Sequence, residues 1–215
     1  VEVTGANVAA TITPHHLLLT PEYGARWHVP LRPAEDHEFM WEALRTGGID
    51  TVSGDNLWRT TRTLEDVAAY GIRSTSRTAY LDAYFNGSSG FLLPVMLSEG
   101  VNKGRITIQR LVEVCCENPA RIFGLYPRKG VIRIGADADL TIWDPAPERT
   151  IECTQHLGIA GFTPYEGWKA RGKPWMTLLR GQVLLNSEGV LEQKPGFGQF
   201  LARTSPLPPI AGSVR

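Results

Sequence analysis

The sequence predicts an α/β protein with a parallel sheet, followed by a smaller all-β module. The first observation is the order of a strand-like run, a helical run, a Gly-Gly pair and a second strand-like run near the start of the chain, which is typical of a βαβ unit. The second is a change of composition after Tyr126, where glycines and prolines separate short runs of strand type. We therefore expect a boundary near residue 126.

The βαβ unit occupies the first quarter of the chain. Its first strand is expected within residues 7–19, because that run is almost continuously apolar, as in a strand covered on both faces. A helix is expected over residues 34–46, since Glu35 and Asp36 load its first turn and Gly47-Gly48 end it. The residues of its apolar side are Phe39, Met40, Trp41 and Leu44. The second strand then ends at Asp55.

The remaining elements follow a long connection over residues 56–90. Loops of this length in a compact domain are usually functional or disordered. An apolar helix is expected over residues 91–97, a helix capped by Thr107 comes next, and Asn118-Pro119 begins a short one. The expected organisation is residues 1–125, a β module over residues 126–203 with strands at 140–143 and 176–179, and a loose tail over residues 204–215.

Charge and cysteine content restrict the class of partner. The 22 basic residues balance the 22 acidic ones, so no field draws the chain to nucleic acid or to an acidic membrane surface. No apolar run approaches the roughly 20 residues that span a bilayer. The three cysteines show no CxxC spacing, which favours a reducing compartment. We expect a cytoplasmic protein with a small-molecule ligand.

Asp55 is the first candidate for chemistry. It follows Thr51-Val52-Ser53-Gly54, and the carboxyl end of a parallel strand is where α/β enzymes place their sites. The alternative is that Asp55 caps a turn or the next helix, the commoner role of an Asp after Gly. Spacing alone leaves Asp55 and the loop at Asn86 as candidates.

His15-His16 suggests a metal site, but adjacent residues of a strand point to opposite faces and cannot easily share one ion. A hydrogen-bonded pair near the end of the sheet is the favoured interpretation. The chain has no HxH, HExxH or CxxC motif, so it lacks the ligands of a self-sufficient zinc site.

Several longer motifs occur in a fixed order. They are SEGVNKGRI at 98–106, ENPARIFGLYPRKG at 117–130 and GADADLTIWDP at 135–145, with TPHHL at 13–17, PLR at 30–32, TPYEGW at 163–168 and RG at 180–181. Together they resemble the cyclic amidohydrolases, the group of dihydropyrimidinases (hydantoinases), dihydroorotases and allantoinases. Long ordered matches of this kind are far more specific than one short motif.

The resemblance implies the C-terminal part of a TIM-type (β/α) barrel followed by a small β-sandwich domain. A full barrel takes about 250 residues, so we expect an incomplete piece. The resemblance also implies a divalent metal, expected to be zinc and binuclear in the full-length family. Of its ligands this chain supplies Asp55; the family's HxH pair, carboxylated lysine and two further histidines would precede Val1.

By the same resemblance, Asp55 matches an aspartate that binds metal and carries a proton from the attacking hydroxide to the leaving nitrogen. A carboxylate suits this role because it can accept and release a proton within one turnover. Asn86 and Gly87 match a loop whose backbone contacts the cyclic imide of the substrate. His28 stands in a substrate segment where the family has Ser or Asn.

The implied function is hydrolysis of a cyclic amide of hydantoin, dihydropyrimidine, dihydroorotate or allantoin type, by a homo-oligomer when full-length. Asn56 stands where many members have His, and Val29 where Pro is common, so the substrate stays open. The alternative is a non-catalytic scaffold or assembly subunit related to these enzymes.

Overall fold

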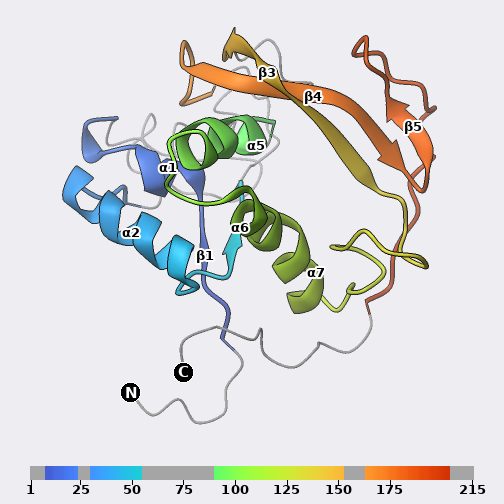
Figure 1. The fold of residues 1–215 in the computed structure, drawn as a ribbon, viewed down its shortest axis with the longest axis horizontal. Coiled ribbons are helices and arrows are strands. Elements are labelled where there is room, and N and C mark those ends of the chain that lie inside the picture. The colour runs from blue at the N-terminus through green and yellow to red at the C-terminus, as the bar shows by residue number, and fades with distance from the viewer. Residues whose placement is uncertain (1–7, 24–29, 55–89, 153–162, 204–215) are drawn as a thin grey trace, which may run out of the picture.

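The computed structural model describes residues 8–23, 30–54, 90–152 and 163–203 (Figure 1). Strands β1 (Thr11–Ile12) and β2 (Thr51–Val52) pair in parallel, with Thr11 opposite Thr51. Helix α2 (Ala34–Thr46) connects them and has the bounds expected from the sequence. It ends at Gly47, whose φ of 95° is left-handed and therefore suits glycine. The α/β prediction with a parallel pair is confirmed.

One residue of the expected apolar side of α2 is placed differently. Trp41 and Leu44 are buried, whereas Phe39 is 76% exposed. Residues 39 and 41 lie about 200° apart around a helix, so both cannot face the same core. The assignment of Phe39 to the core was wrong for this reason.

The strand expected over residues 7–19 is also shorter than predicted. It ends at Ile12, and Pro14–Leu18 form helix α1, followed by the short 3₁₀ turn η1 (Pro21–Tyr23). The side chain of Thr13 caps α1, and Pro14 occupies the first helical turn, where its missing N–H costs nothing. This cap turns the chain away from the sheet.

The helical segments after residue 90 include two π-helical turns. They are α5 (Leu92–Val95), η2 (Met96–Val101), α6 (Ile108–Val112), η3 (Glu113–Glu117) and α7 (Asn118–Ile122). The expected cap at Thr107 is confirmed, because its side chain accepts from the amide of Arg110 at 3.1 Å. The short helix expected to begin at Asn118-Pro119 is confirmed as α7, with Pro119 in its first turn, and it follows η3 without a break because the amide of Asn118 bonds to the carbonyl of Glu113.

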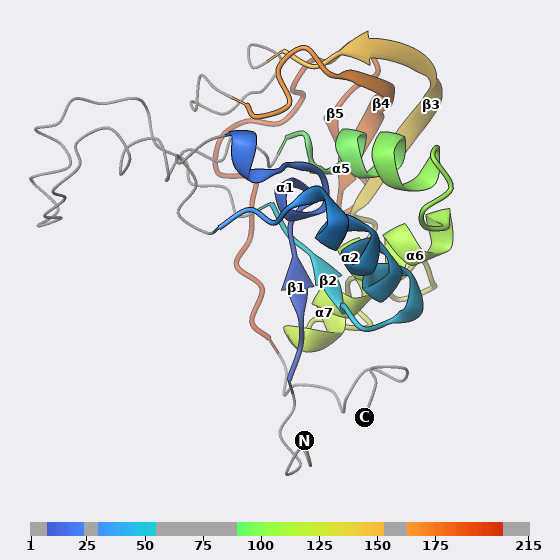
Figure 2. The ribbon, with the colours of Figure 1, turned by 90° about the vertical axis from the view of Figure 1, so that its left-hand side faces the viewer.

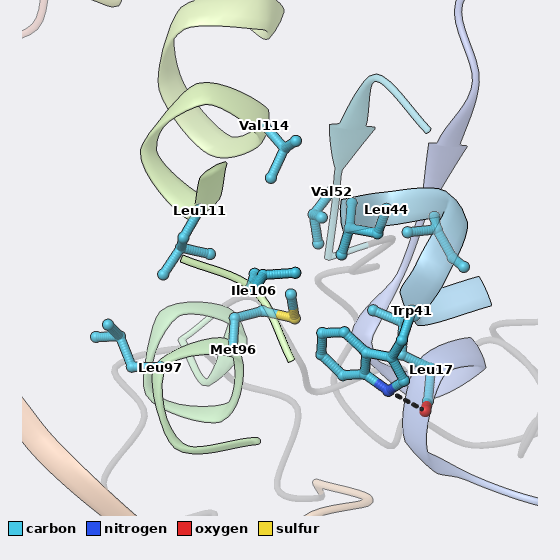
Figure 3. Packing of buried hydrophobic residues seen from close by; sticks show 10 residues of the cluster. Leu17, Trp41, Leu44, Val52, Met96, Leu97, Ile106, Leu111 and Val114 are labelled. Carbon is cyan, nitrogen blue, oxygen red and sulfur yellow. Dashed lines mark hydrogen bonds between the residues drawn. The ribbon is translucent and has the colours of Figure 1, made fainter. Parts of the chain in front are cut away.

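The main core lies between β1–β2, α2 and the helical run of residues 92–122 (Figure 3). Trp41 lies in it, and its indole N–H donates to the carbonyl of Leu17 at 3.2 Å. The members of this core are Ile12, Leu17, Trp41, Leu44, Val52, Met96, Leu97, Ile106, Leu111 and Val114.

The β module forms an antiparallel sheet of β3 (Leu140–Thr150), β4 (Lys169–Leu179) and β5 (Gln182–Leu185), in the order β3-β4-β5. This antiparallel sheet curves over α5 and over the carboxyl end of the parallel β1–β2 pair, next to α1 (Figures 1 and 2). The amide of Arg171 donates to the hydroxyl of Ser98 at 2.7 Å, which ties β4 to η2. Within the described ranges, no helix has the length and apolar character needed to cross a bilayer.

Candidate functional site

The carboxyl ends of β1 and β2 point toward α1, α5 and the β module (Figure 2). The predicted residues Asp55, Asn86, Gly87 and His28 lie outside the described residues, so their roles stay predictions. What the structure does place is the strand that leads to Asp55. The amide of Ser53 donates to the carbonyl of Ile12 at 2.9 Å, so β2 remains paired with β1 until two residues before Asp55.

The carboxyl end of β1 carries Thr13, His15 and His16. The two imidazole rings lie 4.5 Å apart with their planes at 45°. The prediction that they point to opposite faces was wrong, because they lie in the first turn of a helix and not in a strand. The interpretation as hydrogen-bonded residues is confirmed for His16, whose Nδ1 lies 2.6 Å from the hydroxyl oxygen of Thr13.

His15 is buried, with 1% of its surface exposed. Burial, and to a smaller extent the neighbouring His16, lower the pKa of His15 to about 3. An imidazole in this environment stays neutral at physiological pH, because burial removes the water that would solvate its charge. His15 therefore adds no positive charge to this end of the sheet.

These residues do not form a metal site by themselves. In residues 8–23, 30–54, 90–152 and 163–203, no three His, Cys, Asp or Glu side chains are grouped so as to hold an ion. A catalytic zinc takes three protein ligands or more, and Nδ1 of His16 already faces Thr13. A metal at this end of the sheet would need donors beyond the described residues, Asp55 among them by prediction.

A second apolar cluster lies between α1, α5 and the β module. Its members are Leu19, Leu31, Phe91, Val95, Ile151, Tyr165 and Ala170. Two of them adjoin predicted substrate segments: Leu31 comes three residues after His28 (31 − 28), and Phe91 four residues after Gly87 (91 − 87). The structure thus brings the described ends of these two segments into one cluster, together with side chains of the β module.

Sequence reasoning missed two features of this region. Tyr165 is fully buried at the junction with the β module, although its TPYEGW context looks like an ordinary turn. Asp50 is 6% exposed at the amino end of β2, where its carboxylate accepts from the amide of Ala10 at 2.8 Å. An Asp directly before a short apolar strand was the available signal for the second.

Comparison with known proteins gives a consistent result. Residues 40–184 match the model described as "Amidohydrolase family". An L-hydantoinase of Paenarthrobacter aurescens is 38% identical over 176 residues, which are 81% of this chain and 36% of that protein. A dihydroorotase of Bacillus cereus is 34% identical over 195 residues, 87% of this chain and 42% of that protein.

Comparison with solved structures gives the same group of proteins as the sequence comparison. The crystal structure of a dihydropyrimidinase from Brevibacillus agri superposes with a TM-score of 0.78 at 25% identity, covering 95% of this chain and 45% of that one. This chain spans less than half the length of each of these three proteins.

Proposed function

This chain belongs to the amidohydrolase family, and on that basis we propose that it is part of a hydrolase that opens the carbon–nitrogen bond of a cyclic amide. The match over residues 40–184 carries the proposal, because it includes β2 and the segments that follow it. The hydantoinase and dihydroorotase relatives support the reaction class and leave the choice of ring open.

We assign the proton transfer to Asp55. Pairing of Ser53 with Ile12 holds the carboxyl end of β2, the edge where parallel α/β sheets carry their chemistry, and Asp55 is the second residue after Ser53 in the sequence. In the proposed reaction Asp55 takes a proton from the attacking water and delivers it to the ring nitrogen as the amide bond breaks. Asn86, Gly87 and His28 would contact the ring.

Membership of the amidohydrolase family is the reason to include a divalent metal in the proposal, and zinc is the expected ion. Such an ion lowers the pKa of bound water and polarises the amide carbonyl. Because the described residues do not assemble a ligand set, its other donors would have to come from outside them.

The finer architecture is proposed in the same way. Residues 1–125 would supply the last strands and helices of a TIM-type barrel, and residues 126–203 a β-sandwich module. The parallel β1–β2 pair, its α2 crossover and the antiparallel β3-β4-β5 sheet support this division. Homo-oligomerisation of the longer protein and a cytoplasmic location stay predictions.

The test uses the longest natural protein that contains this chain, assayed on hydantoin, dihydrouracil, dihydroorotate and allantoin. At least one ring should open, and Asp55→Asn should lower kcat by about 100-fold or more, as expected for loss of a general base. Asp36→Asn is the matched control, because Asp36 pairs with Arg32 on the surface of α2.

Two outcomes would contradict the proposal. Activity of Asp55→Asn near that of the wild type would remove the role of Asp55. Failure of the folded wild-type protein to open any of the rings with zinc supplied would favour the scaffold alternative, which Asn56 in place of the usual His first suggested.

A further inference from the structure

The amino end of β2 is held by side chains on both sides. On the β1 side, the amide of Asp50 donates to the carbonyl of Ala10 at 2.9 Å, and the amide of Ala10 donates back to Oδ2 of Asp50 at 2.8 Å. The carboxylate of Asp50 thus takes a ladder bond that main-chain carbonyls usually accept in a parallel sheet.

On the other side, side chains of the 108–122 helical run bind the main-chain carbonyls. Nδ2 of Asn118 donates to the carbonyl of Asp50 at 2.8 Å, and both residues are buried. Arg110 donates from Nη2 to the carbonyl of Ile49 at 2.7 Å and from Nε to the carbonyl of Leu44 at 2.8 Å. The main-chain carbonyls of Leu44, Ile49 and Asp50 are therefore each bound by a side chain that lies far away in the sequence.

The π-helical turn η3 explains how Arg110 and Asn118 reach the same strand. They are eight residues apart (118 − 110), and in a regular α-helix that separation would leave their side chains roughly 80° apart around the axis. A π turn takes up one extra residue, so the effective separation is about seven residues and the angle roughly 20°. η3, between the two residues, thus places both on the side of the helix that faces β2.

We propose that Asp50, Asn118 and Arg110 are positioning residues that fix the register of β2 and so set where its carboxyl end presents Asp55. This inference rests on the proposed role of Asp55. The strand has only two residues in regular pairing. We therefore expect a shift at its amino end to move Gly54 and Asp55 as well, because few hydrogen bonds between them resist it. Such residues act without touching the substrate.

The first experiment needs no activity. Amide hydrogen exchange of the 215-residue chain is followed by NMR at Thr51 and Ser53, which bond to Ala10 and Ile12, and at Leu178 of β4 as a distant reference. Asn118→Leu removes the donor at similar volume. Asn102→Leu is the control, because Asn102 is exposed at the end of η2.

We expect exchange at Ser53 to rise by about tenfold in Asn118→Leu with Leu178 unchanged, since a lost buried hydrogen bond opens structure locally. Asn118→Ser, whose hydroxyl is too short to reach Asp50, is read in the same way if Asn118→Leu does not fold. Unchanged exchange at Ser53 would overturn the inference, because it would show that Asn118 has no role in holding β2. An equal rise at Leu178 would overturn it as well, because it would show global destabilisation.

The second experiment measures kinetics in the longer protein. Asp50→Leu should lower kcat by about tenfold with KM within about threefold of wild type, because the reacting group moves while binding contacts remain. Asp50→Asn should restore kcat, since its amide oxygen can still accept from Ala10. A wild-type kcat in Asp50→Leu would overturn positioning even if exchange changes. An inactive wild-type protein would instead refute the proposed function, and it is detected before any variant is made.

Discussion

The ring of Tyr165 meets the ring of Trp168 edge-on, with centroids 5.5 Å apart and planes at 69°. Tyr165 has no exposed surface and lies in the cluster that joins the β module to α5. Its hydroxyl oxygen has no hydrogen-bond partner in the described part of the chain, and burial raises the pKa of the hydroxyl well above its ordinary value. The ring therefore contributes through packing, while the hydroxyl opposes burial.

Replacing Tyr165 separates these two contributions. Tyr165→Phe should leave the free energy of unfolding unchanged or raise it, because a buried hydroxyl without a partner costs energy. Tyr165→Ala should lower it by about 3–5 kcal/mol through the cavity it leaves. Urea unfolding followed by circular dichroism measures both. A loss of more than about 1 kcal/mol in Tyr165→Phe would contradict the packing account and indicate a bound water or ligand at the hydroxyl.

Ser98 links η2 to β4 through its bond with the amide of Arg171. Ser98→Ala should lower the free energy of unfolding by about 1–3 kcal/mol, because a partly buried amide loses its acceptor. Ser187→Ala, at an exposed turn position, is the control and should change little. Equal unfolding midpoints for the two variants would show that solvent replaces the Ser98 hydroxyl at no cost.

His15 should make the protein acid-sensitive. Its pKa is lowered from 6.5 to about 3 in the folded state, chiefly by burial, so the folded state binds the proton less readily than the unfolded state. The stabilisation is complete above about pH 6.5 and is lost as the pH falls toward 3. His15→Leu should flatten the dependence of unfolding free energy on pH between 6.5 and 4, measured by urea titration at each pH. Parallel curves for wild type and variant would rule out His15 as the cause.

Gly172 lies in β4 with φ of 93°, and a Cβ there would overlap Nε1 of Trp143 on β3. Gly172→Ala should therefore lower the free energy of unfolding by about 2 kcal/mol or more, through backbone strain and the displacement of the indole. Gly198→Ala, where a Cβ meets nothing within 4 Å, should be close to neutral. Thermal unfolding of the two variants checks this, and similar midpoints would exclude the predicted clash.

Local signals account for what could be predicted from the sequence. Acidic residues in the first turn and Gly47 after the last are enough to bound α2, and the Thr107 hydroxyl caps a helix through a bond to a residue three positions away. The order of long motifs likewise indicated the family, because it depends on residue identity and not on contacts. The roles of Asp55, Asn86, Gly87 and His28 were derived from that resemblance and stay predictions.

The tertiary structure decided what depends on residues far apart in the chain. The hydrogen bond from Asn118 to Asp50 joins positions that are 68 residues apart, and no local sequence pattern predicts such a pair. Phe39 is exposed and Tyr165 buried because of what α2 and the β module pack against, not because of their own hydrophobicity. The His15 and His16 rings lie together because Thr13 capped a helix where apolar residues had suggested a strand. Burial and side-chain direction are set by packing partners, and those are fixed only when the chain folds.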